Sequence, residues 1–282
     1  MGKTGLVAEG GGMRGIYAAG ILDVLGEHGI SFDGLIGVSA GSVHVLSFAA
    51  GQHGRNIRYY KKYCADPRFV SFRNLIRTGD IADEQFCYHD LPEKLDPFDY
   101  EAFDRAGIPV WCVCTNLETG GPEYLQITDA RTQIDILRAG ASLPFCSRPV
   151  EWEGMKLLDG GCSDSIPVQA FRRMGYDKNV VILTQAEGYV KKAQNPLMVR
   201  AAYHKYPNFC RTLERRHTMY NKTLYEIRQL EQEGKVFVFR PSQDPDIARL
   251  AKDPKELDRV YRMGRRNAEA KLEQLREFLF LY

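Results

Sequence analysis

The sequence predicts an α/β fold with a mostly parallel central sheet, followed by a mostly helical C-terminal addition. The first supporting observation is a strand, a glycine loop, a helix and a second strand within about 30 residues, a βαβ unit that requires parallel strands. The second is a change of character after residue 187, where long charged helical segments replace short apolar runs. We therefore expect a core domain over residues 1–187 and a mostly helical extension over residues 188–282.

The βαβ unit begins with an apolar strand over residues 4–8 that ends at a cluster of three glycines. Apolar residues at helical spacing then predict a helix over residues 16–28, which Gly29 ends as a C-cap. A second apolar strand over residues 34–38 leads into a helix that opens at Gly41. This order places two loops at the carboxyl ends of neighbouring strands.

Residues 65–106 differ from the rest of the core in composition. They follow a predicted helix over residues 55–64 and mix seven aromatic side chains with polar residues and three prolines. This composition suits a cap over an apolar site, and it equally suits a set of ordinary surface elements. The sequence leaves both interpretations open.

The later part of the core alternates strands and helices again. Strands are expected over residues 108–115, 123–127, 155–158 and 180–184, and helices over residues 132–141 and 167–174. Beyond residue 187 we expect a long charged helix over residues 196–233, a strand over residues 235–240 and an amphipathic helix over residues 254–281.

Composition and charge exclude few classes of protein. The hydrophobic fraction of 44% and the charged fraction of 26% are ordinary for a globular protein, and a net charge of +2 predicts no nucleic-acid partner. The charge is uneven, because residues 187–282 hold 20 Lys and Arg against 13 Asp and Glu, a balance of +7. This excess indicates either solvated helix faces or contact with anionic lipid headgroups.

The cysteines and the N-terminal segment bear on metals and on localisation. The seven cysteines include no Cys-x-x-Cys pair and no His/Cys cluster at zinc spacing, so we expect no metal. An odd number of cysteines without an export signal predicts free thiols in a reducing compartment. The sequence has neither a signal-peptide-like segment nor about 18 uninterrupted apolar residues. We expect a cytoplasmic protein whose membrane contact is peripheral, and no feature specifies an oligomeric state.

The segment Gly37-Val-Ser-Ala-Gly41 has the form Gly-x-Ser-x-Gly. A serine on a sharp strand-to-helix turn needs small residues two positions away on either side, because larger side chains collide with the strand and the helix. The turn exposes the hydroxyl at the helix N-terminus, where free N–H groups favour negative charge. The apolar run before the motif and the helical pattern after it match this requirement. Ser39 is therefore the candidate nucleophile of a serine acyl hydrolase.

A glycine loop precedes the first helix, and it consists of Gly10, Gly11, Gly12, Met13, Arg14 and Gly15. Consecutive glycines present N–H groups outward, and at the start of a helix they make an anion site. In acyl transfer this loop would be the oxyanion hole. The loop and Ser39 both follow parallel strands joined by one helix, so we expect them at the same edge of the sheet.

The same loop also fits Gly-x-Gly-x-x-Gly, the fingerprint of a dinucleotide-binding module, which is the alternative interpretation. That fingerprint expects an acidic residue at the end of the second strand. Here the second strand ends at Ser39, and the nearest acid, Asp33, precedes the strand. The sequence therefore lacks the strand-end acidic residue that the dinucleotide interpretation requires.

A serine nucleophile needs a base, and Asp159 is the candidate. Asp159 ends an apolar segment and precedes Gly160 and Gly161, so that backbone can approach it closely. As a base it needs a pKa raised by burial, whereas its simpler interpretation is an ordinary turn aspartate. No histidine is expected at a strand end late in the fold, and a structural role is predicted for each of His28, His44, His53, His89, His204 and His217.

The three motifs, Gly10–Gly15, Gly37–Gly41 and Asp159–Gly161, occur in this order and together resemble the signature of the patatin-like phospholipase family. The resemblance covers about residues 5–185 and includes Ala-Ser-Leu-Pro-Phe over residues 141–145. It implies a three-layer α/β/α fold and hydrolysis of carboxylic ester bonds in lipids, without a cofactor. A small-ester or thioester hydrolase with the same chemistry is the alternative.

The resemblance also implies a role for each motif. Ser39 would be the nucleophile and Asp159 the general base of a dyad without histidine, which forms an acyl-enzyme intermediate. The glycine loop would be the oxyanion hole, with Arg14 at the family's basic position. Ser165 departs from the pattern, because family members often carry Asn there. The expected partner is a lipid or another acyl ester.

Overall fold

The computed structural model describes residues 2–280, and within them eight strands form a single sheet. The strands are β1 (Thr4–Ala8), β2 (Gly34–Val38), β3 (Val110–Asn116), β4 (Pro122–Ile127), β5 (Val150–Trp152), β6 (Met155–Asp159), β7 (Lys178–Ile182) and β8 (Val236–Phe239). Their order is β5-β6-β3-β2-β1-β7-β8, with β4 paired to β3. The pairs from β3 through β2, β1 and β7 to β8 are parallel, and β4, β6 and β5 join antiparallel. The predicted mostly parallel sheet is confirmed.

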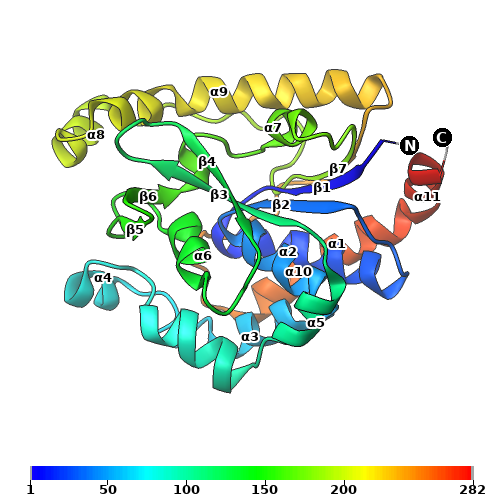
Figure 1. The fold of residues 1–282 in the computed structure, drawn as a ribbon, viewed down its shortest axis with the longest axis horizontal. Helices are drawn as coiled ribbons and strands as arrows, with labels where there is room; N and C mark the ends of the chain where they lie inside the picture. The colour runs from blue at the N-terminus through cyan, green and yellow to red at the C-terminus, as the bar shows by residue number, and fades with distance from the viewer. Residues whose placement is uncertain (1, 281–282) are drawn as a thin grey trace.

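Helices cover both faces of the sheet and make a three-layer α/β/α structure (Figure 1). One face is covered by α1 (Ile16–Glu27), α2 (Ala40–Ala49), α6 (Ile134–Ala141) and α10 (Pro254–Ala270). The other face is covered by α7 (Val168–Arg173) and α9 (Pro207–Gln232). The three-layer fold implied by the family resemblance is therefore present.

The central strands are buried on both sides, which explains their continuous apolar sequences. In β1, Leu6 and Ala8 join the core beneath α1 and α2, whereas Val7 joins the core beneath α7 and α9. Ile36 and Val181, on the strands at either side, also belong to the second core. All five side chains are fully buried. The sheet is thus a rigid middle layer on which the loops at its edge can be positioned.

One edge of β3 is shared by two strands, and this sharing places the candidate site. β2 runs parallel to the first part of β3, and its last pair joins Val38 to Val113. β6 continues along the same edge in the opposite direction, and it pairs Asp159 with Cys114. β4 occupies the other edge of β3. The carboxyl ends of β2 and β6 therefore meet, and they bring Ser39 and Asp159 together.

Residues 65–106 form a cap of three helical segments over the α2 and α6 side of the molecule (Figure 1). These segments are α4 (Phe72–Thr78), the π-helical η2 (Phe86–Leu95) and α5 (Tyr100–Ala106), and α3 (Arg55–Tyr63) precedes them. The aromatic side chains of Phe69, Phe86 and Phe98 are buried in the cap. Of the two interpretations left open by the sequence, the structure matches the cap over an apolar site.

The segment after residue 187 is packed into the same structure. Its strand β8 extends the sheet by pairing with β7. Its helix α10 lies so close to α1 that a Cβ atom on Gly264 would stand 2.1 Å from the carbonyl oxygen of Tyr17. The Asn267 side chain donates a hydrogen bond to the Tyr17 hydroxyl at 2.9 Å. The segment therefore adds a strand as well as helices, and the expected boundary near residue 187 stays a prediction.

Two expected helices differ from the structure, and one strand was not expected. The predicted helix over residues 196–233 is divided into α8 (Pro196–Tyr203) and α9, because Pro207 has no N–H group to continue a helix and restricts the residue before it. The predicted helix over residues 254–281 is divided into α10 and α11 (Leu272–Phe280), and Leu281 lies outside the described residues. The short strand β5 was not expected. Across residues 2–280, the helices are all too short or too polar to cross a membrane.

A buried ion pair ties the cap to α3 and supplies a test of the cap's structure. Asp96 is 6% exposed and lies 3.5 Å from the guanidinium of Arg55, which is 4% exposed. Asp96 also accepts two hydrogen bonds from Arg58, at 2.7 and 2.8 Å.

We expect Asp96→Asn to lower the free energy of unfolding by about 3 kcal/mol, because it leaves a buried guanidinium without its counter-charge. Asp90→Asn removes an exposed pair with Lys94 and should cost less than about 1 kcal/mol. Urea denaturation of the two variants measures both values. Equal effects would contradict this account of the cap.

Candidate active site

Ser39 lies on a strained turn between β2 and α2, with φ +54° and ψ −127°. This region is unfavourable for a residue other than glycine and costs on the order of 1–3 kcal/mol. The glycines at either side are required by close packing. A Cβ atom on Gly37 would lie 2.4 Å from the Cα atom of Ser42, and one on Gly41 would lie 2.5 Å from the carbonyl oxygen of Ala8. The geometry is therefore that of the nucleophile turn that the motif predicts.

The glycine loop packs directly against this turn. It follows β1 and continues as the short helical turn η1 (Gly12–Gly15). A Cβ atom on Gly10 would lie 2.7 Å from the Cβ atom of Ser39 and 2.7 Å from the carbonyl oxygen of Val38. Only glycine fits at this position, and the loop backbone consequently lies beside the Ser39 side chain.

Two of the loop amides are already engaged within the protein. The Met13 N–H group donates to the carbonyl oxygen of Arg249 at 3.1 Å, and that of Arg14 donates to the carbonyl oxygen of Gly11 at 3.2 Å. The N–H groups of Gly10 and Gly11 form no hydrogen bond with any residue in the range 2–280. The donors available to a ligand therefore lie at the glycine end of the loop.

Asp159 is buried beside Ser39 with an exposed fraction of 2%. Its Oδ1 atom accepts a hydrogen bond from the Gly161 amide at 2.7 Å, and its Oδ2 atom has no hydrogen-bond partner among the described residues. Burial raises the pKa of Asp159, and the neighbouring Ser39 hydroxyl, the Gly161 amide and the charges of Arg216 and Arg249 oppose this rise. A carboxylate with a raised pKa and a free oxygen atom can accept a proton.

The two glycines after Asp159 hold the end of β6 against β3. A Cβ atom on Gly160 would lie 2.2 Å from the carbonyl oxygen of Val113, so this position has no room for a side chain. The Gly161 carbonyl oxygen accepts hydrogen bonds from the Ser165 hydroxyl, at 2.7 Å, and from Nε of Arg216. Ser165 thus supplies a hydrogen bond to this turn although it departs from the family pattern.

The histidines lie outside the two cavities at Ser39, although the His44 ring packs against Gly15 of the glycine loop. His44 lies on α2 with its ring fully buried, 5.6 Å from the ring of Tyr60. Burial lowers its pKa to about 3, so the ring is neutral near pH 7. Within residues 2–280, no histidine lines either of the two cavities that meet at Ser39.

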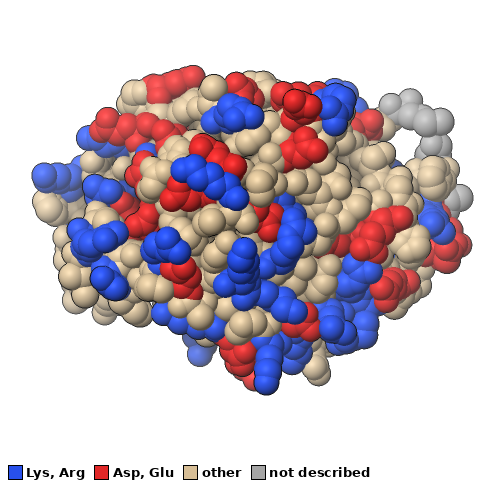
Figure 2. Space-filling model, turned by 90° about the horizontal axis from the view of Figure 1, so that it is seen from below, with Lys and Arg blue, Asp and Glu red and all other residues tan. Residues whose placement is uncertain are grey.

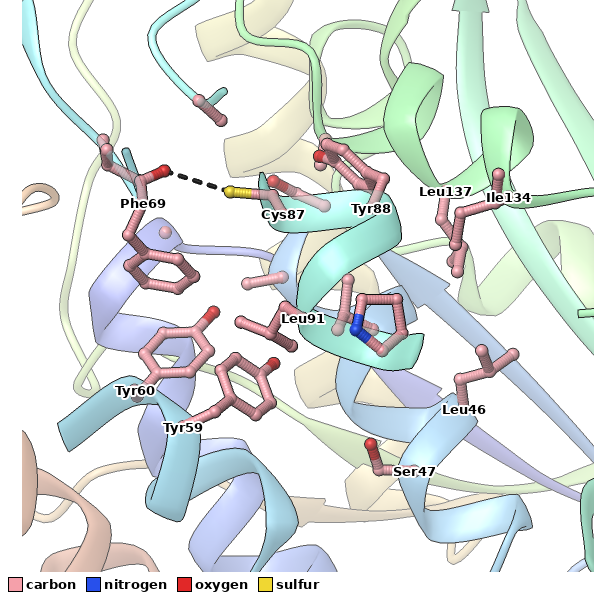
Figure 3. Close-up of a pocket in the computed structure, with 18 of the residues that line it drawn as sticks. Leu46, Ser47, Tyr59, Tyr60, Phe69, Cys87, Tyr88, Leu91, Ile134 and Leu137 are labelled. Atoms are coloured by element: carbon pink, nitrogen blue, oxygen red, sulfur yellow. Dashed lines mark hydrogen bonds between the residues drawn. The ribbon is translucent and has the colours of Figure 1, made fainter. Parts of the chain in front are cut away.

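The first of these cavities is apolar, has a volume of about 180 Å³ and extends from Ser39 beneath the cap. Figure 3 shows side chains of α2, α3, η2 and α6 pointing into it, and the Cys87 thiol donating to the Phe69 carbonyl oxygen at 3.2 Å. The lining includes Leu46, Tyr59, Tyr60, Phe69, Leu91 and Leu137. Such a cavity suits an extended hydrocarbon group.

The second cavity is small, about 50 Å³, and polar. It contains Ser39, Asp159 and the free glycine amides, and it is lined by side chains that the sequence did not single out: Glu9, Lys191, Arg216, Tyr220 and Arg249. Four of these five lie after residue 187 in the segment whose basic excess was visible in the sequence. The basic excess was the one feature of the sequence that pointed to these residues. Their position beside Ser39 depends on packing between residues far apart in the sequence, which the sequence alone does not reveal.

The dinucleotide alternative finds no support at this edge of the sheet. Asp33, the nearest acid, accepts hydrogen bonds from the amide and hydroxyl groups of Thr4 at 2.6 and 2.8 Å. Thr4 begins β1, so Asp33 lies at the edge of the sheet opposite Ser39. Ser39, and not an acidic residue of the same strand, therefore stands at the end of β2, where the fingerprint places its ribose-binding acid.

Comparison with known proteins finds both structural and sequence similarities. Crystallised VipD from Legionella pneumophila aligns with 97% of this chain and 67% of its own chain, at 14% identity and a TM-score of 0.48. The uncharacterised protein YjjU of Escherichia coli is 32% identical over 189 residues, which are 65% of this chain and 52% of YjjU. Lysophospholipase NTE1 of Lodderomyces elongisporus is 28% identical over 177 residues, 61% of this chain and 12% of that protein.

This chain thus spans about half the length of YjjU and a small part of the lysophospholipase. Two family models match it. A domain of unknown function, DUF6363, matches residues 206–280. The model of the patatin-like phospholipases matches residues 6–172, which include the glycine loop, Ser39 and Asp159. The chain therefore belongs to the patatin-like phospholipase family.

Proposed function

We propose that this protein is a serine acyl hydrolase that cleaves carboxylic ester bonds of lipids. The observation that carries the proposal is the position of Ser39, which stands where an apolar cavity meets a polar one containing a buried carboxylate and unused backbone amides. The family membership and the similarity to lysophospholipases support a lipid ester as the substrate.

In the proposed mechanism, Asp159 accepts the hydroxyl proton of Ser39 as the serine oxygen attacks the acyl carbonyl. The tetrahedral intermediate collapses to an acyl-enzyme and releases the alcohol, which takes the proton from Asp159. Asp159 then deprotonates a water molecule that attacks the acyl-enzyme. The second tetrahedral intermediate collapses, the carboxylic acid is released, and the Ser39 oxygen takes the proton back from Asp159. The free Oδ2 atom of Asp159 suits this transfer, because it has no competing hydrogen-bond donor among the described residues.

The oxyanion of each intermediate would be held by the amides of Gly10 and Gly11. Both groups are unengaged in the structure, and the Gly10 backbone lies beside Ser39. The amides of Met13 and Arg14 are engaged elsewhere, so within the six-residue loop we assign the oxyanion to its glycine end. Each donor of this kind is worth roughly 10²–10³ in rate.

We also propose that α4 brings the protein into contact with an anionic lipid surface. Phe72 and Ile76 project from α4 with exposed fractions of 66% and 88%, next to the exposed Arg73 and Arg77. Figure 2, which views the molecule from the cap side, shows many Lys and Arg side chains on this face, with Asp and Glu side chains among them. The residues that flank α4, Phe69–Val70 and Ile81–Ala82, line the apolar cavity. A lipid surface at α4 would therefore lie at the rim of that cavity.

Ser39→Ala should lower hydrolysis of long-chain acyl esters and of acyl thioesters by at least about 10³-fold, because no other group supplies the nucleophile. It should also abolish covalent labelling by an organophosphonate probe. Ser242→Ala, which alters an exposed hydroxyl, serves as the control. Hydrolysis and labelling that persist in Ser39→Ala would sink the proposal, and a preference for the thioester in the native protein would favour the alternative substrate class.

The double variant Phe72→Ser/Ile76→Ser should co-sediment with anionic phospholipid vesicles at least tenfold less than the native protein. Moving each apolar side chain from water into the lipid contributes about 1.5–3 kcal/mol of favourable binding free energy, which the variant loses. Tyr225→Ser, which alters an exposed aromatic side chain on α9, is the matched control. Equal binding by the double variant and the native protein would exclude α4 as the contact.

A further inference from the structure

The polar cavity beside Ser39 carries more positive charge than its own carboxylates balance. Its lining includes the two carboxylates of Glu9 and Asp159 and four cationic side chains, those of Arg14, Lys191, Arg216 and Arg249. Among residues 2–280, none of the four cations forms an ion pair. This contrasts with most buried or half-buried cations elsewhere in the structure, such as Arg55, which has a counter-charge.

The carboxylate of Glu9 is already satisfied by neutral donors. Glu9 is 4% exposed, and its two oxygen atoms accept hydrogen bonds from the Tyr220 hydroxyl at 2.6 Å and the Thr184 amide at 2.7 Å. Asp159 is the candidate base and is held by the Gly161 amide. The two carboxylates can offset at most two of the four positive charges, so the cavity as a whole favours an anionic ligand.

The cations are held toward the cavity by the surrounding backbone. Nε of Arg216, on α9, donates to the Gly161 carbonyl oxygen at the turn after Asp159. The backbone of Lys191 forms two hydrogen bonds with the Asn221 side chain, at 2.8 and 3.1 Å. The Lys191 ammonium then lies 4.1 Å from the centre of the Tyr220 ring. These contacts hold the positive charges beside Ser39 and Asp159 before a ligand binds. Binding therefore costs little additional side-chain entropy.

Arg249 joins the two cavities. Its carbonyl oxygen accepts the Met13 N–H group at 3.1 Å, which ties residue 249 to the glycine loop. Its side chain is exposed at the mouth, lines both cavities and forms no hydrogen bond with a described residue. Arg14 contributes from the loop itself and uses only its Nε atom, in a long bond of 3.4 Å to the Thr184 hydroxyl.

Electrostatics agree with this geometry. Burial, reinforced by the charge of Arg216, lowers the pKa of Lys191 to about 8. The charge of Glu9 opposes this lowering, whereas Arg249 and Arg14 act on the pKa of Lys191 in the same direction as Arg216. An anion bound among these groups would relieve their mutual repulsion. Several guanidinium groups with free N–H donors match the oxygen atoms of a phosphate particularly well.

We propose that Lys191, Arg216 and Arg249, with Arg14, form a subsite that binds the phosphate of a phosphorylated acyl ester. The inference rests on the proposed hydrolysis at Ser39, because it names the headgroup of the same substrate. The acyl chain lies in the apolar cavity, the ester carbonyl lies at Ser39 and the phosphate lies in the polar cavity. An acylglycerol phosphate, whose ester and phosphate are a few bonds apart, has this arrangement. Arg216 and Arg249 belong to the segment of unknown function, which thereby completes the site.

The test compares two substrates with the same acyl chain, 1-acylglycerol 3-phosphate and 1-acylglycerol, in the full-length protein. The quantity measured is the ratio of their kcat/KM values, in which any effect on Asp159 or on folding cancels. We expect the native protein to prefer the phosphorylated substrate by at least tenfold. Arg216→Gln and Lys191→Gln should each lower this ratio about 10-fold or more, and the exposed Arg249→Gln should lower it less.

Arg215→Gln is the matched control, because Arg215 neighbours Arg216 on α9 but is exposed and does not line the cavity. Arg215→Gln should leave the ratio of kcat/KM values unchanged. Arg216→Lys should retain part of the preference for the phosphorylated substrate, because it keeps the positive charge. Thermal unfolding identifies any variant that fails to fold. The ratio of kcat/KM values in the variants that do fold then tests the subsite.

Equal ratios in the native protein and the variants, or an equal fall in Arg215→Gln, would overturn the subsite. Inorganic phosphate that alters 1-acylglycerol hydrolysis, without a preference for the phosphorylated substrate, would also overturn it in favour of a site for free phosphate. Failure of the native protein to hydrolyse either substrate would contradict the hydrolase itself. Hydrolysis that needs Ser39 but ignores the phosphate would contradict the subsite alone.

Discussion

The pairing of β3 with two strands along one edge is the constraint on which the rest of the site depends. β2 ends where β6 ends, because Val38 pairs with Val113 and Asp159 pairs with the next residue, Cys114. Since β2 and β6 approach from opposite directions, residues 120 positions apart in the chain come together within a rigid layer. The glycine loop joins them from β1, which pairs with the other edge of β2. Three loops thus meet at one point without any of them being long or flexible.

This arrangement is held at a cost in stability. Ser39 adopts a backbone conformation that costs on the order of 1–3 kcal/mol. Asp159 is buried, and its raised pKa means that the folded state binds the proton more tightly than the unfolded chain does. Its contribution to stability therefore decreases as the pH rises from its ordinary pKa through the raised one. The closely packed cores on both faces of the sheet offset these costs.

The sequence predicted the features that depend on local chemistry. Gly37, Ser39 and Gly41 form a pattern whose spacing is dictated by one turn, and the βαβ unit requires its strands to be parallel. Lys191, Arg216 and Arg249 could not be placed in this way. They belong to the segment before α8, to α9 and to the segment before α10, which reach the site only through contacts between residues far apart in the sequence. The division of the last two predicted helices shows the same limit, although Pro207 was a visible signal for one of them. The charge count revealed the excess of basic residues after residue 187, but it could not show which of them lie at the site.

The most direct test of the account is the pH dependence of kcat/KM in the native protein and in Asp159→Asn. A base must be deprotonated to work, so kcat/KM should fall as the pH drops through a pKa above the ordinary 3.8 of an aspartate. Asp159→Asn should lower kcat by roughly 10²–10⁴ and remove this acidic fall from the residual rate. An acidic fall that persists in Asp159→Asn, or that disappears in His44→Gln, would contradict the dyad and assign the base to another group.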